Sequence, residues 1–132
     1  PWTTLDSYAD LLSTLIELNM INNVPSIQLA IRLLIPAGSC LLEVPEVNRL
    51  IGEFEPRSLG YPWRHSDSRV DELQREIQTT IEHATACTDR LEIFAQICEL
   101  LGPRLEQPAP LPPVTTIRPR ATIPYLSEPW YC

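Results

Sequence analysis

The chain has 132 residues, of which 44% are hydrophobic, and it carries a formal net charge of −7 at pH 7 with a pI near 4.7. This acidic balance argues against nucleic acid or an anionic membrane as a partner, because both require clustered Lys and Arg to neutralise phosphates. More than half of the 14 prolines lie from Pro103 onward, so we expect the hydrophobic core to come from roughly the first hundred residues.

Four cysteines lie far apart in the sequence and form no C-x-x-C pair: Cys40, Cys87, Cys98 and Cys132. This usage is typical of a reducing compartment and predicts a cytoplasmic protein. Cys40, Cys87 and Cys98 are most simply interpreted as small buried hydrophobic residues. No apolar run approaches the roughly 20 residues that are needed to cross a bilayer, so we expect no membrane partner.

A helix is predicted near the start of the sequence. Thr3 is followed three residues later by Asp6, a pattern in which the hydroxyl accepts from first-turn amides while the acid reaches back. An apolar stripe at spacings of three and four indicates a helix that runs to about Asn19. The stripe consists of Leu5, Tyr8, Leu11, Leu12, Leu15 and Leu18.

The next apolar run, residues 27–35, is bounded by Pro25 and Pro36. It is short and alternates between apolar and mixed positions, so we predict a buried strand. A strand that follows a capped helix is typical of a βα unit in a barrel or a parallel sheet. Because one strand cannot satisfy its own backbone groups, its neighbours must come from sequence outside this chain.

Three further helices are predicted downstream. One covers about residues 45–52 with Pro45 in its first turn, one runs from a cap at Asp67 or Ser68 to about Ala86, and one covers about residues 88–101. We expect the last two to pack as a hairpin. The predicted domains are residues 1–44, a barrel part; residues 45–102, a helical extension; and residues 103–132, a Pro-rich extended tail whose bulky apolar groups dock on a surface.

Short motifs that carry their own catalytic mechanism are absent, including Walker, G-x-G-x-x-G, H-E-x-x-H and G-x-S-x-G patterns. His65 and His83 lie on different predicted elements, and neither is paired with a nucleophile. Gln28 and Arg32 are polar groups on a strand that we expect to be buried. They therefore bind a ligand, or form an internal salt bridge. The cluster at residues 61–65 is an aromatic platform or a loop that covers a core edge.

Four stretches, taken in order, carry a resemblance to a known family: Pro1–Leu5, Ile27–Leu42, Tyr61–His65 and Ile123–Cys132. Together they resemble the C-terminal part of radical S-adenosylmethionine proteins with a cobalamin-binding-type N-terminal domain. The most similar group ends in Cys-Cys-Ala-Glu-Pro or Cys-selenocysteine-Ala-Glu-Pro, the CUAEP/CCAEP tail. The resemblance implies an α/β fragment, in which the last βα unit of a partial (β/α) barrel precedes a mainly helical extension and a Pro-rich tail.

The resemblance also implies a function. Such enzymes use a [4Fe-4S] cluster to cleave S-adenosylmethionine into a 5′-deoxyadenosyl radical, which abstracts hydrogen from a substrate. Gln28 and Arg32 would face the barrel interior, where S-adenosylmethionine and a small-molecule substrate are held. Cobalamin is left open as a further cofactor of the full-length protein.

Two departures from the family limit what this chain is expected to do. The Cys-x-x-x-Cys-x-x-Cys motif that holds the cluster does not occur, so we expect a metal site and catalysis only together with a missing N-terminal part. The sequence ends at Cys132, where the family continues with selenocysteine or cysteine. We therefore expect a fragment whose last codon precedes a UGA, with the Cys132 thiol as a candidate catalytic group.

The competing hypothesis is a noncatalytic module. In it, a helical bundle with a Pro-rich docking tail binds another protein.

Overall fold

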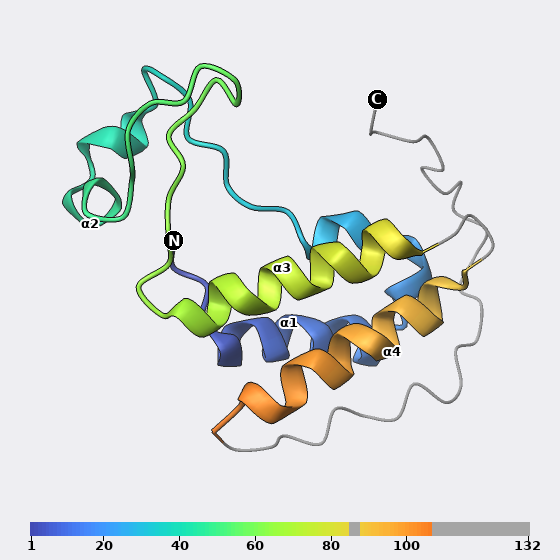
Figure 1. Ribbon diagram of the computed structural model, residues 1–132. Coiled ribbons are helices and arrows are strands. Elements are labelled where there is room, and N and C mark those ends of the chain that lie inside the picture. The colour runs from blue at the N-terminus through green and yellow to red at the C-terminus, as the bar shows by residue number, and fades with distance from the viewer. Residues whose placement is uncertain (85–87, 107–132) are drawn as a thin grey trace.

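Three helices form the main body of the computed structural model, which describes residues 1–84 and 88–106. These are α1 (Leu5–Glu17), α3 (Ser68–His83) and α4 (Arg90–Leu101). Figure 1 shows the three packed together as a bundle, with the short helix α2 (Pro45–Asn48) set apart from them. We call residues 31–66, which carry α2, the loop lobe. Four single-turn 3₁₀ segments complete the regular structure: Ile21–Asn23, Ser26–Leu29, Cys40–Glu43 and Gly102–Arg104.

Helix α1 begins and ends at local hydrogen-bonding motifs. The Ser7 backbone N–H donates to the Thr4 hydroxyl at 3.1 Å, and the Thr4 N–H donates to the Ser7 hydroxyl at 2.9 Å. This is a capping box, placed one residue later than the predicted Thr3 start. At the other end Asn19 has a φ of +54°, and the Met20 N–H donates to the Leu15 carbonyl at 2.8 Å. Such a left-handed residue closes a Schellman motif, for which Asn is suited.

The hydrophobic core lies between α1, α3 and α4. Phe94, Ile97 and Leu101 of α4 are buried against Leu12 of α1 and Ile77 of α3. Fully burying side chains of this size stabilises a fold by about 1.5–3 kcal/mol each. Helices α3 and α4 make the most extensive contacts of any two elements, which confirms the predicted hairpin.

The N-termini of α3 and α4 are each capped by an aspartate. Asp67 accepts from the Arg69 N–H at 3.0 Å, and Asp89 accepts from the Leu91 N–H at 3.1 Å. The capped start of α3 agrees with the sequence prediction. The helix predicted at 45–52 is shorter in the structure, where α2 ends at Asn48.

The α/β fold prediction is wrong for the part of the chain that the structure describes. Within residues 1–84 and 88–106 there is no strand and no sheet, only three isolated bridges. The run 27–35 is instead a 3₁₀ turn at Ser26–Leu29, followed by extended backbone. The last βα unit of a partial barrel is therefore not present in these residues.

The physical reason for this error lies in the surroundings of the run. Among the described residues its backbone pairs with no second strand: the Ile35 carbonyl accepts from the Tyr61 N–H at 2.8 Å, and Pro36 bridges to Gly60. The alternation of apolar residues predicts burial of the face that carries Ile31 and Leu33, yet these two side chains are 67% and 41% exposed. A strand requires neighbouring strands to pair with, and none lies among the described residues.

The loop lobe is held by backbone contacts between segments far apart in the sequence. Gly52 N–H donates to the Pro62 carbonyl at 2.6 Å, and Arg64 N–H donates to the Leu50 carbonyl at 3.0 Å. Ile35 and Val47 are fully buried. Gly60 lies so close to this segment that a Cβ there would be 3.0 Å from the Ile35 carbonyl oxygen.

None of the helices within residues 1–84 and 88–106 has the length and apolar character that crossing a membrane requires. The predicted Pro-rich tail lies almost wholly outside the described residues, as does Cys87.

A pair of leucines on α1 tests the core. Leu12 is fully buried, whereas Leu18, at the C-terminal end of the same helix, is 47% exposed. We expect Leu12→Ala to lower the free energy of unfolding by about 2–5 kcal/mol, because it leaves a cavity. Leu18→Ala should cost only about 0.5 kcal/mol. Urea denaturation followed by circular dichroism measures both, and equal losses would contradict this packing.

Candidate functional site

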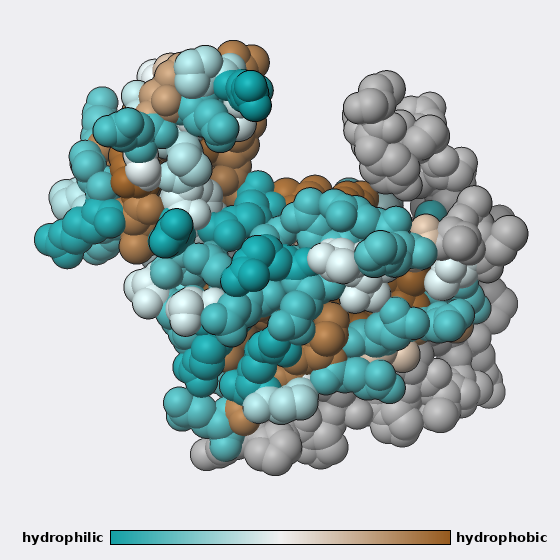
Figure 2. All heavy atoms as spheres, viewed as in Figure 1, coloured by the Kyte–Doolittle hydropathy of each residue, from teal (hydrophilic) through white to brown (hydrophobic). Residues whose placement is uncertain are grey.

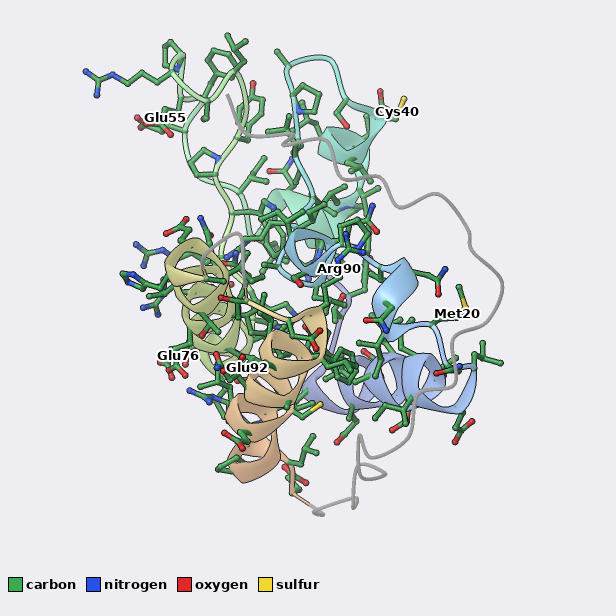
Figure 3. All side chains as sticks on the ribbon, turned by 90° about the vertical axis from the view of Figure 1, so that its right-hand side faces the viewer. Met20, Cys40, Glu55, Glu76, Arg90 and Glu92 are labelled. Carbon is green, nitrogen blue, oxygen red and sulfur yellow. The ribbon has the colours of Figure 1, made fainter. Side chains whose placement is uncertain are left out.

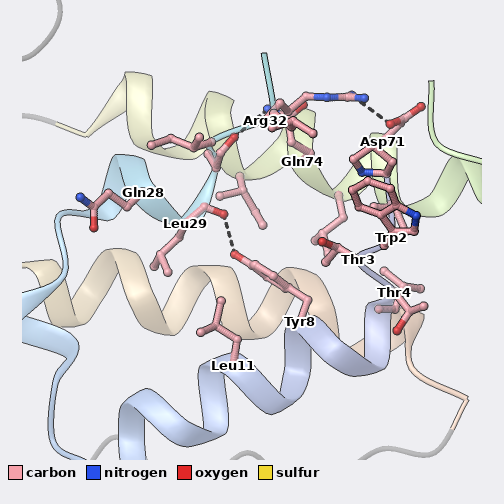
Figure 4. Close-up of a pocket in the computed structure, with 18 of the residues that line it drawn as sticks. Trp2, Thr3, Thr4, Tyr8, Leu11, Gln28, Leu29, Arg32, Asp71 and Gln74 are labelled. Atoms are coloured by element: carbon pink, nitrogen blue, oxygen red, sulfur yellow. Dashed lines mark hydrogen bonds and ion pairs between the residues drawn. The ribbon is translucent and has the colours of Figure 1, made fainter. Parts of the chain in front are cut away.

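A groove of about 480 Å³ opens between the start of α1, the segment 28–33 and the N-terminal half of α3 (Figure 4). We call it the N-terminal groove. Residues Pro1–Leu5 form one wall and Gln28–Leu33 another, while Trp63 of the loop lobe and residues of α3 complete it. Its volume lies in the range of small-ligand pockets. Three segments that are far apart in the sequence therefore meet at one surface.

The walls of the N-terminal groove are mainly aromatic and aliphatic. Trp2 is 57% exposed and Leu11 is 46% exposed. Both large side chains line the groove instead of packing in the hydrophobic core. The Tyr8 phenol is more deeply placed, and its O–H donates to the Leu29 carbonyl at 2.9 Å. Burial, with a smaller contribution from Cys98, raises the pKa of Tyr8 well above its ordinary value. Tyr8 therefore stays protonated and serves as a structural donor rather than an acid–base group.

Arg32 connects three segments at the edge of the N-terminal groove. One guanidinium nitrogen lies 2.9 Å from an Asp71 carboxylate oxygen, and another donates to the Trp63 carbonyl at 2.9 Å. The guanidinium carbon also lies 4.0 Å from the centre of the Trp63 ring, a cation–π distance. Arg32 thus forms an internal ion pair, which was one of its two predicted roles, while it also lines the groove.

The partners of Arg32 are themselves fixed. The Trp63 indole N–H donates to the Leu33 carbonyl at 2.8 Å. Asp71 accepts from the backbone N–H of His65 at 3.0 Å, and the His65 ring pairs with the Asp67 backbone through its Nδ1. The cluster at 61–65 therefore works as a junction between the loop lobe and α3, and His65 is a part of this junction.

Gln28, the second predicted ligand residue, also lines the N-terminal groove but is exposed. In Figure 4 its side chain lies at the far end from Trp2 and points away from Arg32. The amide that sequence reasoning missed is Gln74 of α3, whose Nε2 donates to the Ala30 carbonyl at 3.1 Å and to Gln78 at 3.0 Å. The four-residue spacing of Gln74 and Gln78 places both amides on one face of a helix, and this spacing could have indicated their hydrogen bond.

The cysteines within the described residues do not form a metal site. Cys40 lies at the outer edge of the loop lobe in Figure 3, and Cys98 lies half-buried on α4. Burial, and to a lesser extent the charge of Glu99, raises the pKa of Cys98 to about 11, which disfavours the thiolate that a metal requires. No group of three His, Cys, Asp or Glu residues in ranges 1–84 and 88–106 is placed to hold a metal ion.

These residues therefore do not fit a [4Fe-4S] cluster. Cys132, the predicted catalytic thiol, lies outside the described residues.

Comparisons of the chain with protein-family models, with curated proteins and with solved structures found no match.

The Arg32 junction can be tested by substitution. Arg32→Met removes an ion pair whose side chains are 29% and 18% exposed, and we expect it to lower the free energy of unfolding by about 1–2 kcal/mol. Arg32→Lys keeps the charge but not the second hydrogen bond or the flat stacking surface, and it should fall in between. Urea denaturation measures each loss.

The matched control for Arg32 is Arg69→Met. Arg69 pairs with Asp67 at 2.8 Å, but its side chain is 50% exposed, so its loss should be smaller than that of Arg32→Met. Equal or reversed losses would show that Arg32 does not hold the junction.

The alkylation rates of Cys40 and Cys98 should differ, and that of Cys98 should depend on pH. The thiolate is the reactive form, so at about pH 8 a thiol with a pKa of about 11 is ionised in roughly one molecule in a thousand. Iodoacetamide should alkylate the exposed Cys40 while Cys98 stays unmodified. Each unit of rising pH should then speed Cys98 alkylation about tenfold. Peptide mass spectrometry measures the alkylation of both cysteines, and the chain unfolded in urea is the control. Equal alkylation rates of Cys40 and Cys98 in the native chain would contradict the burial of Cys98.

Proposed function

We propose that this chain is a region of a radical S-adenosylmethionine iron–sulfur enzyme, and that its N-terminal groove contributes an apolar wall beside that enzyme's reaction chamber. One observation supports this most. Of the four stretches that resemble the family, the three within the described residues all contribute to the N-terminal groove: Pro1–Leu5, Ile27–Leu42 through its residues 28–33, and Tyr61–His65 through Trp63.

The exposure of these stretches supports a role at a surface rather than in the core. Trp2 is 57% exposed and Ile31 is 67% exposed. Core packing does not explain such large apolar groups, whereas a contact surface does. The resemblance therefore includes exposed side chains such as Trp2 and Ile31 beside buried ones such as Leu5 and Ile35.

The groove also has a chemistry that suits radical reactions. Three of its polar side chains are paired within the protein: Tyr8 with the Leu29 carbonyl, Arg32 with Asp71, and Gln74 with the Ala30 carbonyl. The rest of the lining is mainly apolar and aromatic. Covered by other parts of the enzyme, such a surface would exclude water and so protect reactive intermediates from side reactions.

The radical chemistry itself would come from a cluster and S-adenosylmethionine that other parts of the enzyme hold. Cobalamin and the identity of the small-molecule substrate stay open. We also propose that the enzyme works in a reducing, cytoplasmic compartment, where thiols such as those of Cys40 and Cys98 stay free.

A second candidate function is a noncatalytic helical module that binds another protein. The observation in its favour is the helical body of residues 1–84 and 88–106, which offers an open apolar groove and no fit to a metal cluster. Apolar grooves between helices are a common docking surface for peptides.

The two functions differ in anaerobic reconstitution of the protein made from its complete reading frame. A radical enzyme should show cluster absorbance and release 5′-deoxyadenosine from S-adenosylmethionine. Trp2→Ala should lower this release roughly tenfold, because misplaced reacting groups are costly. Phe54→Ala, an exposed aromatic of the loop lobe outside the N-terminal groove, is the matched control and should leave the release unchanged.

Two results would overturn the enzyme proposal. A complete reading frame without Cys-x-x-x-Cys-x-x-Cys, or a reconstituted protein that binds no cluster, supports the binding module instead. Equal effects of Trp2→Ala and Phe54→Ala would remove the groove from the proposed role.

A further inference from the structure

We propose that the N-terminal groove binds the chain's own Pro-rich segment, residues 107–132, with the apolar stretch 123–131 seated against Trp2, Leu11 and Trp63. The inference rests on the groove and on the sequence of that segment. It does not depend on the proposed enzyme function.

The groove specifies an apolar occupant. Two of its more deeply placed hydrogen-bonding side chains are satisfied within the protein: Tyr8 donates to Leu29, and Gln74 donates to Ala30 and Gln78. A strongly polar ligand would have to break these bonds. A peptide that presents apolar and aromatic side chains can instead cover the exposed faces of Trp2 and Leu11 without such a loss.

The segment 107–132 has this composition. Its stretch 123–131 reads Ile-Pro-Tyr-Leu-Ser-Glu-Pro-Trp-Tyr, so large apolar side chains alternate with prolines. Prolines restrict the backbone of the free segment, and less conformational entropy is then lost on binding. Pro-rich segments are known to dock in grooves lined by aromatic side chains, and Trp2, Tyr8 and Trp63 line this one.

The segment starts at the same end of the bundle as the groove. The charge of Glu106, the residue before it, acts on Arg69 together with that of Asp6, so Glu106 lies near the starts of α1 and α3. Figure 1 shows the C-terminal end of α4 at this end of the bundle. Val70 and Asp71, which follow Arg69, line the groove.

The reach of the segment is sufficient. The 16 residues of α3 span roughly 24 Å at 1.5 Å per residue. The 16 residues from 107 to 122 span roughly 50 Å when extended as polyproline II at 3.1 Å per residue. The stretch 123–131 can therefore reach any part of the N-terminal groove from Glu106.

Charge also favours an intramolecular contact. The segment contains Arg118, Arg120 and Glu128 as its charged side chains, a net charge of +1, which leaves −8 on the rest of the chain. The two parts attract each other, and the tether keeps the effective concentration of the segment high. In Figure 2 most of the visible face of the described residues is hydrophilic, and hydrophobic residues show between the hydrophilic ones.

Paramagnetic broadening in the full chain tests the contact. A nitroxide is attached to Cys132 in a variant with Cys40→Ser, Cys87→Ser and Cys98→Ala, and the indole N–H signals of Trp2 and Trp63 are recorded by ¹⁵N NMR. We expect both signals to lose most of their intensity and to recover when the nitroxide is reduced. Unchanged intensities would overturn the proposal.

Two leucines on α1 supply matched variants for this experiment. Leu11, in the groove, is 46% exposed, and Leu18, outside it, is 47% exposed. Leu11→Asp should abolish the broadening, whereas Leu18→Asp should preserve it. Broadening of ¹⁵N-labelled chains by separate nitroxide-labelled chains would instead identify a second copy as the source, and would overturn binding within one chain.

A second measurement keeps the native cysteines. In the otherwise unchanged chain, Trp130→Ala should shift the Trp2 and Trp63 indole signals, and Val114→Ala, in the same segment but outside 123–131, should not. Equal spectra for both variants would contradict the seating of residues 123–131 in the groove.

Discussion

The Arg32 guanidinium holds together the parts of this molecule that are not joined by the helical core. It pairs with Asp71 of α3, donates to the Trp63 carbonyl and stacks on the Trp63 ring. A planar group with several donors can make all three contacts at once, which an ammonium cannot. The position of the loop lobe on the bundle, and therefore the shape of the N-terminal groove, depends on this side chain together with the hydrogen bond from the His65 N–H to Asp71.

The fold has two kinds of apolar surface, one buried in the core and one exposed at the groove. The core residues of α4, such as Phe94 and Ile97, are buried between the other two helices and stabilise the bundle. Trp2 and Leu11, by contrast, are held at the rim of the groove with about half of their surface exposed. Exposed apolar groups cost free energy in water, so a contact that covers them is favoured.

Both proposals use this surface, but in different ways. In the radical enzyme, the groove would face the reaction chamber and exclude water from it. In the intramolecular contact, residues 123–131 would cover it. The two uses exclude each other at any one time, because both need the same apolar surface, in which the polar groups of Tyr8 and Gln74 are already paired.

Much of the fold could be predicted because it depends on neighbours in sequence. The cap at Asp67 bonds to an amide two residues away, and a spacing of three to four residues identifies an amphipathic helix. For the candidate site, the sequence pointed to Arg32 and to the cluster at 61–65, because a charged residue in an apolar run needs a partner.

What the sequence by itself determined is therefore the existence and approximate limits of α1, α3 and α4. Only the tertiary structure decided that residues 27–35 form a turn and an extended segment rather than a strand, since a strand depends on partners elsewhere in the chain. It also decided that Leu11 is exposed while Leu12 is buried, and that Arg32 pairs with Asp71. These outcomes depend on contacts between residues far apart in sequence, which no local pattern encodes.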